Sequence, residues 1–320
     1  MTMKKFFRKL RYNLFVSHVL MALTRPFYLL ALLLVRWISI KVKVNGTVVN
    51  YAGTTIRFPK SVGINICSRI YWLGTEGFEP LAGKTLLLLF MKADVFFDIG
   101  SNFGFYSVLA QKVSERIQVF CFEPLPNIFD DNLRFHKKNE MTRQKLFKCV
   151  LSNRIGETVI YVPDVYSISS EITSSSVEKD FLYNKAYPQK EMVIYSRTLD
   201  DVMIKENDLL INRRIVLKVD VEGHESSVLA GGDSFFMTFR PFAVVEIDIR
   251  NKQNLIAIFN RSETLNYSIY CITTNGYFRM SIENLAGFAG GSDFLFVPNE
   301  VGVFDYISYQ GLEKLTSNDR

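Results

Sequence analysis

Cysteine and histidine are scarce: the chain of 320 residues contains four cysteines and three histidines. No two of the cysteines form a CxxC pair, and three of them lie within apolar runs that are typical of strands. Reduced thiols buried in a cytoplasmic fold are therefore the favoured interpretation. The histidines are too few and too scattered for a histidine-based zinc site, and no metal centre is predicted.

Acidic residues are missing from the first quarter of the chain, because residues 1–75 contain 12 Lys or Arg and no Asp or Glu. The whole chain has 38 basic and 32 acidic residues, which leaves 26 basic and 32 acidic ones, a net charge of −6, for residues 76–320. The remainder has no stripe of Lys and Arg with interleaved aromatic residues, so no nucleic-acid partner is predicted. The basic N-terminal quarter instead favours an anionic partner.

Long unbroken hydrophobic runs are also missing. Residues 14–34 include 16 apolar residues out of 21, but Arg25 and Pro26 interrupt them in the middle. A central Arg costs about 2.5–3.5 kcal/mol in a spanning helix, and no signal-peptide cleavage site follows. Residues 1–44 are therefore predicted to form a basic and apolar helical extension. Residues 1–43 would lie on an anionic membrane surface, at its inner face; a spanning helix and a helix packed on the main domain are the alternatives.

The remaining composition, 48% apolar and 22% charged, is that of a globular protein, and the length suits two domains or one large α/β domain with an appendage. From residue 93 to 300 short apolar runs alternate with helical patterns, which predicts a mostly parallel sheet with helices on both faces. Two later runs are predicted to pair at one edge. The strand candidates are residues 95–99, 117–122, 146–151, 215–219, 243–247, 267–273 and 292–297, and the helix candidates are 104–113, 127–138 and 224–236.

The flanks of this domain carry weaker signals. Residues 45–92 are predicted to be a hairpin and a lead-in, in which Asn45–Gly46 is a turn between two β-branched runs. Residues 154–162 predict an extra β-hairpin arm. The arm leads into a polar insertion, where seven of the residues 167–176 are Ser or Thr. Residues 301–320 are predicted to be a C-terminal tail.

A glycine-rich turn, Asp98-Ile-Gly100-Ser-Asn102-Phe-Gly104, follows the first strand and opens the first helix. Glycines let the backbone turn tightly and approach a ligand, with helix N–H groups pointing into the site. Asn102 stands where a dinucleotide fingerprint has its middle glycine. The carboxylate of Asp98 suits a ligand with a positive amino group better than a pyrophosphate. The alternative is a tight structural turn that Asp98 caps locally.

The second strand ends at Glu123-Pro124, about 25 residues after Asp98. An acidic residue at this point is placed to accept two hydrogen bonds from ribose hydroxyls. Together with the glycine-rich turn, it predicts a nucleoside-type ligand at the carboxyl edge of the sheet.

Charged residues cluster where the fourth strand enters a helix, in the stretch Lys218-Val-Asp220-Val-Glu222-Gly-His224-Glu225. Strand alternation puts Lys218 and Asp220 on one face. Such a cluster can hold a general base, a metal or a ligand's amino group, whereas the structural alternative is capping of the helix. Asp220 is the first choice for accepting a proton from a substrate hydroxyl, with Glu222 and His224 as alternates. A divalent metal held by Asp220 and Glu222 is the minority alternative.

Four stretches carry a family resemblance: DIGSNFGFYS (98–107), FEPLPNIF (122–129), RTLDD (197–201) and LKVDVEGHESSVLAGG (217–232). In this order and rough spacing, over about residues 93–300, they resemble the FkbM family of S-adenosylmethionine-dependent methyltransferases. The resemblance implies a Rossmann-like class I methyltransferase fold with strand order 3-2-1-4-5-7-6. It also implies O-methylation, often of sugars in glycans or of secondary metabolites.

The resemblance further implies S-adenosyl-L-methionine as the cofactor. The turn at 98–104 would then hold its methionine part, and Glu123, followed by Pro124, would hold its ribose. Val150 and Leu151 would lie beside the adenine. Residues 1–92 lie outside the resemblance and inherit nothing from it.

The leading hypothesis is therefore methyl transfer to a hydroxyl of a small-molecule or glycan acceptor. A nucleotide-sugar or NAD-dependent oxidoreductase on the same architecture is the second hypothesis, and Asn102 and the missing third phosphate-loop glycine count against it. A non-catalytic membrane-associated binding module is the third. The intact set of glycine turn, strand-end Glu123 and DVEG stretch counts against that.

Overall fold

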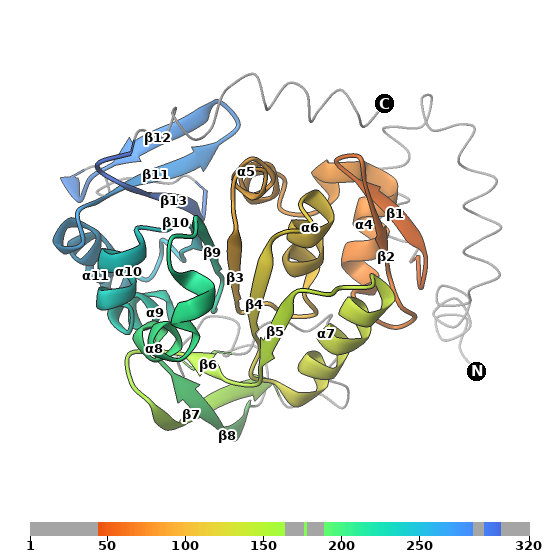
Figure 1. Cartoon of the computed structure of the whole chain (residues 1–320), viewed down its shortest axis with the longest axis horizontal. Helices are drawn as coiled ribbons and strands as arrows, with labels where there is room; N and C mark the ends of the chain where they lie inside the picture. The colour runs from red at the N-terminus through yellow and green to blue at the C-terminus, as the bar shows by residue number, and fades with distance from the viewer. Residues whose placement is uncertain (1–43, 164–175, 178–188, 284–290, 302–320) are drawn as a thin grey trace.

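An eight-stranded sheet with the order β12-β11-β13-β10-β9-β3-β4-β5 runs through the centre of the molecule (Figure 1). The protein is represented by a computed structural model, which describes residues 44–163, 176–177, 189–283 and 291–301. The strands are β3 (Val95–Ile99), β4 (Gln118–Phe122), β5 (Gln144–Phe147), β9 (Ile215–Val219), β10 (Phe242–Glu246), β11 (Tyr267–Thr273), β12 (Gly276–Met280) and β13 (Asp293–Pro298).

The topology is that of a class I methyltransferase. Strands β5, β4, β3, β9 and β10 pair in parallel, and β13 is inserted antiparallel between β10 and β11. Counted along the chain without β12, the order is 3-2-1-4-5-7-6. The predicted α/β, Rossmann-like fold is confirmed. The two late runs do pair, but the edge strand is β12, which the sequence analysis missed.

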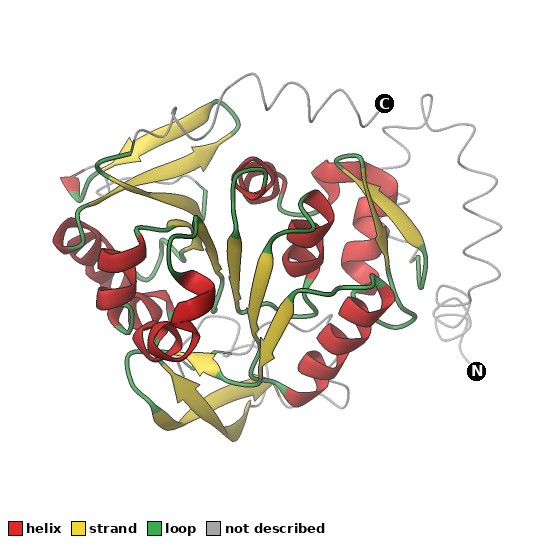
Figure 2. Ribbon diagram, viewed as in Figure 1, coloured by secondary structure: helices red, strands yellow, loops and turns green. Residues whose placement is uncertain are grey.

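Helices cover both faces of the sheet (Figure 2). Two buried apolar clusters result, one on each face, and successive strand residues alternate between them: Phe96 belongs to the first and Phe97 to the second. The first face carries α4 (Ile64–Leu73), η2 (Gly74–Gly77), α5 (Pro80–Phe90), α6 (Phe105–Val113) and α7 (Pro126–Lys138), and the second carries α8 (Leu199–Leu210), α9 (Glu225–Ala230), α10 (Asp233–Phe239) and α11 (Lys252–Thr264).

The lead-in is part of the first core rather than a separate unit. Its Phe58 ring packs against the rings of Phe103 and Phe135, with centroids 6.0 and 5.0 Å apart. The Asn139 side chain, after α7, bonds both the backbone N–H and the carbonyl of Arg57. These contacts hold the lead-in against the glycine-rich turn and α7, and α5 also packs against α6.

The lead-in contains a hairpin other than the predicted one, whose first strand, residues 40–44, lies mostly outside the described residues. Strand β1 (Val48–Tyr51) pairs with β2 (Thr54–Arg57), which follows it along the chain. The turn residues Ala52 and Gly53 have φ of 49° and 75°, the two positive values of a type I′ turn. Asn45 instead bonds the Ser61 N–H through its side chain.

Two predicted elements are split. The run 146–151 is divided between β5 and β6 (Val150–Leu151), and β6 joins a second sheet with order β6-β8-β7. In that sheet β7 (Gly156–Pro163) pairs with β8 (Gln189–Arg197), so the arm's second strand lies beyond the polar insertion. The run 224–236 divides into α9 and α10 because Gly231 lies against β6: a Cβ there would be 2.0 Å from the Ser152 carbonyl oxygen.

The predicted helical extension, most of the polar insertion and nearly all of the predicted tail lie outside the described residues. Among the helices that the structure does describe, none is both long and apolar enough to span a membrane.

Candidate active site

A cavity of about 380 Å³ lies at the carboxyl ends of β3, β4, β9 and β10. The chain order of the strands reverses there, between β3 and β9, which is where open α/β sheets bind ligands. The volume is within the usual range for small-molecule sites, about 300–1,000 Å³. The structure brings together every predicted site residue except Gly104: the cavity is lined by Asp98, Gly100, Asn102, Glu123, Pro124, Val150, Leu151, Lys218, Asp220, Glu222 and His224.

Two glycines of the β3–α6 turn are required by close packing. Gly100 has a φ of 78°, and a Cβ on it would lie 1.8 Å from the Asp220 carbonyl oxygen. The Asp220 N–H donates to the Ile99 carbonyl at 3.0 Å, so the two motif loops lie against each other. At Gly104, with a φ of 84°, a Cβ would lie 2.6 Å from His136 Nε2. Gly104 therefore faces α7 instead of the cavity.

Asp98 is buried near the carboxyl end of β3, where it lines the cavity. It is 2% exposed, and its Oδ2 accepts hydrogen bonds from the Ser107 N–H at 3.0 Å and from the Ser107 hydroxyl at 2.6 Å. Burial raises the pKa of Asp98 to about 6, although the Ser107 bonds and the Lys218 charge lower it. Asp98 therefore caps the turn locally, as the structural alternative predicts, because it anchors the first turn of α6. It also lines the cavity.

Glu123 is anchored by two backbone donors. Its Oε2 accepts the Asn102 N–H at 3.1 Å and its Oε1 accepts the Leu125 N–H at 2.9 Å. Burial raises the pKa of Glu123 to about 7, against the lowering by those two N–H groups. Each carboxylate oxygen has a second lone pair available. The anchored carboxylate can therefore accept further hydrogen bonds from a ligand in the cavity.

Lys218 and Asp220 share a face, as the strand alternation predicts. Lys218 is 5% exposed, and its Nζ lies 2.6 Å from Asp220 Oδ2, 3.6 Å from Glu79 Oε2 and 5.1 Å from the centre of the Tyr106 ring. Burial lowers the pKa of Lys218, but the carboxylates of Asp220 and Glu79 outweigh this and raise it well above its usual value. Lys218 is therefore a permanent cation in this part of the cavity.

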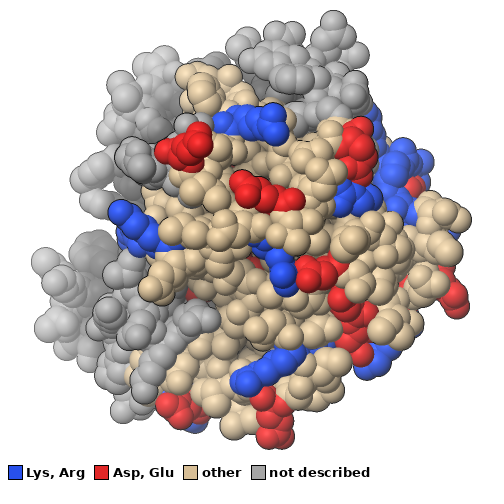
Figure 3. All heavy atoms as spheres, turned by 90° about the vertical axis from the view of Figure 1, so that its left-hand side faces the viewer, with Lys and Arg blue, Asp and Glu red and all other residues tan. Residues whose placement is uncertain are grey.

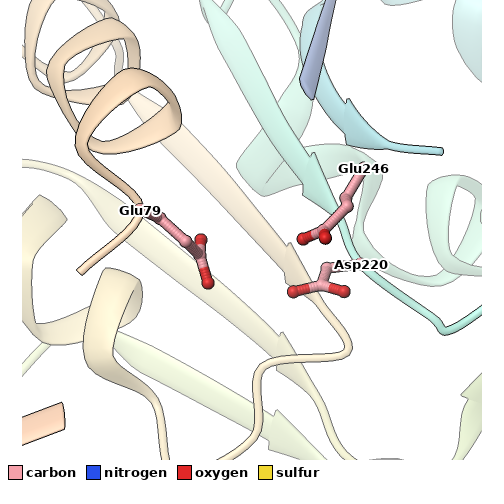
Figure 4. Close-up of side chains that lie close together, drawn as sticks. All are labelled: Glu79, Asp220 and Glu246. Atoms are coloured by element: carbon pink, nitrogen blue, oxygen red, sulfur yellow. The ribbon is translucent and has the colours of Figure 1, made fainter. Parts of the chain in front are cut away.

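Three carboxylates from different parts of the chain converge in the cavity (Figure 4), and two of them lie near the Lys218 ammonium. Glu79 precedes α5, Asp220 follows β9 and Glu246 ends β10, and an oxygen from each lies within 4.8 Å of the others. Repulsion from Asp220, followed by burial, raises the pKa of Glu246 to about 9. The metal alternative named Asp220 and Glu222, whereas the carboxylates that lie together are those of Glu79, Asp220 and Glu246. The Lys218 ammonium offsets part of their negative charge.

Glu222 and His224 are held by neighbours on other elements. Glu222 has a φ of 53°, and its carbonyl accepts the Ser176 hydroxyl at 2.6 Å. Burial and the charge of Asp220 raise the pKa of the Glu222 carboxyl to about 8. His224 is 6% exposed, with its Nε2 2.9 Å from the Ser152 hydroxyl. Both side chains line the cavity, on the side next to β6.

Glu79, Tyr106 and Glu246 were missed by the sequence analysis. Glu246 carried a usable signal, because it is an acidic residue at the end of a predicted strand, as Glu123 is. Glu79 carried none, since it belongs to no motif. It reaches the site only because the lead-in packs on α6, where Phe78 stacks on Tyr106 with ring centres 5.8 Å apart.

Comparison with known proteins decides the family. The family model described as "Methyltransferase FkbM domain" matches residues 98–269. The chain belongs to the FkbM methyltransferase family. The FkbM match begins at the glycine-rich turn and ends in β11, so the lead-in with Glu79 lies outside it.

The chain is similar to several named relatives of this family. It is 27% identical over 154 residues to the 31-O-demethyl-FK506 methyltransferase FkbM of Streptomyces tacrolimicus, covering 43% of this chain and 59% of that protein. It is 30% identical over 158 residues to the hexuronic acid methyltransferase AglP of Haloferax volcanii, covering 48% and 56%. The chain thus spans less than two thirds of the length of these relatives.

A crystal structure of a methyltransferase FkbM from Methylobacillus flagellatus is a further match, at 15% identity and a TM-score of 0.38, over 64% of this chain and 43% of that one.

Proposed function

We propose that the chain is an S-adenosylmethionine-dependent O-methyltransferase that acts on a hydroxyl of a sugar, in a glycan or a small molecule. One observation carries the proposal: the cavity holds an anchored strand-end carboxylate, Glu123, beside the glycine-rich turn, and a Lys218–Asp220 pair on its other side. The first two elements suit a nucleoside cofactor. The charged pair suits the hydroxyl that would receive the methyl group.

The residues present fit S-adenosylmethionine. The Glu123 oxygens have lone pairs free for the two ribose hydroxyls. Because Gly100 has no side chain, the Asp220 loop can lie directly against the glycine-rich turn. The carboxylates of Glu79 and Asp220 outnumber the Lys218 cation, so this part of the cavity favours a positively charged group. When bound, the cofactor supplies a methyl group on cationic sulfur, which is already activated for transfer.

The chain's own residues would position the reactants. Glu123 would fix the ribose, and the Asp98–Ser107 bonds would keep the turn in place beneath it. Asp220 would accept the hydrogen bond of the acceptor hydroxyl and orient its oxygen. Because Asp220 is paired with Lys218 at 2.6 Å, the position of its carboxylate is fixed. Orientation is therefore its main role, and His224 and Glu222 would line the acceptor side.

A sugar hydroxyl is the acceptor that the relatives' names favour. AglP is named for a hexuronic acid, and the Streptomyces relative for a demethylated oxygen of FK506. A nucleic-acid acceptor is disfavoured by the charge distribution. On the face shown in Figure 3, the Lys and Arg side chains of the described residues are interspersed with Asp and Glu.

We further propose that residues 1–43 contact an anionic membrane surface, because residues 1–75 contain 12 Lys or Arg and no Asp or Glu.

The test is methyl transfer from isotopically labelled S-adenosylmethionine to a panel of neutral methyl glycosides, uronic acids and short RNAs. The proposal predicts label in a sugar methyl ether, a product stable to mild alkali. Label found only in RNA, or only in an alkali-labile methyl ester of a uronic acid, would contradict it.

A further inference from the structure

Glu79 lies outside the family match, yet its carboxylate is part of the cavity. It stands immediately before Pro80, at the N-cap position of α5, where its own φ is 38°. Its side chain is 25% exposed and lines the cavity. Figure 4 shows the carboxylate pointing toward Asp220 and Glu246, from the opposite side of the site. The lead-in therefore contributes a charged group to the place where the acceptor would bind.

Two donors favour the ionised form of Glu79. The Tyr106 hydroxyl donates to Glu79 Oε2 at 3.0 Å, and the Lys218 ammonium lies 3.6 Å from the same atom. The ammonium is 1.0 Å closer to Asp220, at 2.6 Å against 3.6 Å. Asp220 is thus the tight ion-pair partner, whereas Glu79 is oriented by a neutral hydroxyl and has the ammonium at the longer distance.

Two other carboxyls of the cavity, those of Glu222 and Glu246, lack such donors. Among the described residues, none donates a hydrogen bond to the side chain of Glu222 or Glu246. With pKa values raised to about 8 and about 9, both are mostly protonated at neutral pH. Burial raises the pKa of Glu79 only to about 7, because Lys218 and Tyr106 lower it. The charged and titratable groups that face Glu79 are Tyr106 on α6, Lys218 on β9, Asp220 just after β9, Glu246 on β10 and Asp293 on β13.

We propose that Glu79 is a catalytic residue of the transfer site, whose ionised carboxylate takes the proton of the acceptor hydroxyl. The inference rests on the proposed function. In the step, the acceptor oxygen forms a bond to the methyl carbon as the carbon–sulfur bond breaks, and that bond's electron pair stays on sulfur. The hydroxyl proton passes to Glu79. The products are a methyl ether and S-adenosylhomocysteine, and no further reactant is required.

The test measures the charge that faces the transfer point, without needing the acceptor. Sinefungin, an analogue with an amine-bearing carbon in place of the methylated sulfur, is compared with S-adenosylhomocysteine by calorimetry. At pH 8 the wild-type chain should prefer sinefungin by about tenfold or more, because its ammonium would meet an ionised carboxylate. Glu79→Gln should lose most of this preference and still bind S-adenosylhomocysteine as the wild type does. Glu76→Gln, in the same lead-in but paired with Lys84, is the matched control and should retain the preference.

The pH dependence supplies a second readout, which needs no variant. In the wild type the preference for sinefungin should fall as the pH drops through about 7, and in Glu79→Gln this fall should be absent. An equal preference in the wild type and Glu79→Gln overturns the assignment of Glu79. So does a wild-type preference that does not change between pH 8 and pH 6. If neither compound binds the wild type, the proposed function itself fails, together with this inference.

Discussion

Gly100 and the Asp220 backbone cross so closely that a Cβ on Gly100 would lie 1.8 Å from the Asp220 carbonyl oxygen. This contact joins the turn that would hold the cofactor to the loop that would hold the acceptor. Neither loop can shift without the other, because the Asp220 N–H is also bonded to Ile99. The geometry of the whole site depends on a glycine at this position.

Gly100→Ala should therefore disrupt both loops. The left-handed backbone alone costs an L-residue about 1–2 kcal/mol, and the clash forces the Asp220 loop away. We expect loss of S-adenosylhomocysteine binding in calorimetry and a lower midpoint in urea unfolding. Gly53→Ala is the matched control: it has a similar φ of 75° and no atom within 4 Å of its Cβ. It should lose some stability and bind normally; equal binding by both variants would contradict the account.

Glu123→Ala should weaken cofactor binding without unfolding the domain. Hydrogen bonds to a charged acceptor contribute about 1.5–3 kcal/mol each, so the loss of the ribose bonds should raise the dissociation constant of S-adenosylhomocysteine tenfold or more. Adenine alone, which has no ribose, should bind the variant and the wild type equally. Unchanged S-adenosylhomocysteine affinity in Glu123→Ala would remove this residue from the site.

The buried carboxyls should make the ligand-free protein less stable as the pH rises. A carboxyl whose pKa is higher in the folded state holds its proton there and loses stability as the pH increases through that window. For Glu246 the window runs from about 4.5, its ordinary value, to about 9. Glu246→Gln should therefore be more stable than the wild type at pH 8 and little changed at pH 4.5, as measured by urea unfolding. The exposed Glu263→Gln should show no such difference, and a stabilisation of Glu246→Gln that is the same at both pH values would contradict the argument.

Asp220→Asn removes the closest partner of the buried Lys218 ammonium but keeps the side chain's shape. Breaking one partner of a buried pair costs about 3–5 kcal/mol, although Glu79 at 3.6 Å offsets part of that here. We expect lower stability and a large loss of methyl transfer, with affinity for S-adenosylhomocysteine kept. Wild-type turnover in the variant would exclude a role for Asp220. An assay of the wild type with a chelator distinguishes this role of Asp220 from the metal alternative. The metal alternative predicts that the chelator abolishes activity, whereas the role of Asp220 proposed here predicts no effect.

Deleting residues 1–40 should reduce sedimentation with anionic vesicles, since this segment holds seven of the 12 basic residues found before residue 76. Neutral vesicles are the control, because they lack the charge to which the basic residues respond. If the shortened chain sediments with anionic vesicles as the full chain does, the proposed membrane contact is wrong.

The sequence pattern alone predicts the strands that form one continuous buried apolar run. β3, β9 and β11 have the predicted bounds, because each is a buried apolar run with a polar boundary. β6 was predicted only as the end of the run 146–151, and β8 was not predicted, since the pairing of these two strands joins segments more than 40 residues apart. Periodicity reports which residues are buried but not which strand they pair with.

The candidate site divides in the same way. The motif residues Asp98, Glu123 and Asp220 were found because each lies at or just after the end of a strand, and the parallel sheet brings strand ends to one edge. Glu79 was not found, because its place in the cavity depends on how α5 packs against α6. A residue whose function depends on tertiary packing alone leaves no signal in a single sequence.

The central claim, that this cavity binds S-adenosylmethionine rather than a nicotinamide dinucleotide, is tested most directly by calorimetric titration of the full chain. S-adenosylhomocysteine and NAD are titrated in parallel at pH 7.5, with Glu123→Ala as the reference for the site. The account predicts saturable one-to-one binding of S-adenosylhomocysteine, weakened in the variant, and no binding of NAD. Binding of NAD with none of S-adenosylhomocysteine would contradict it.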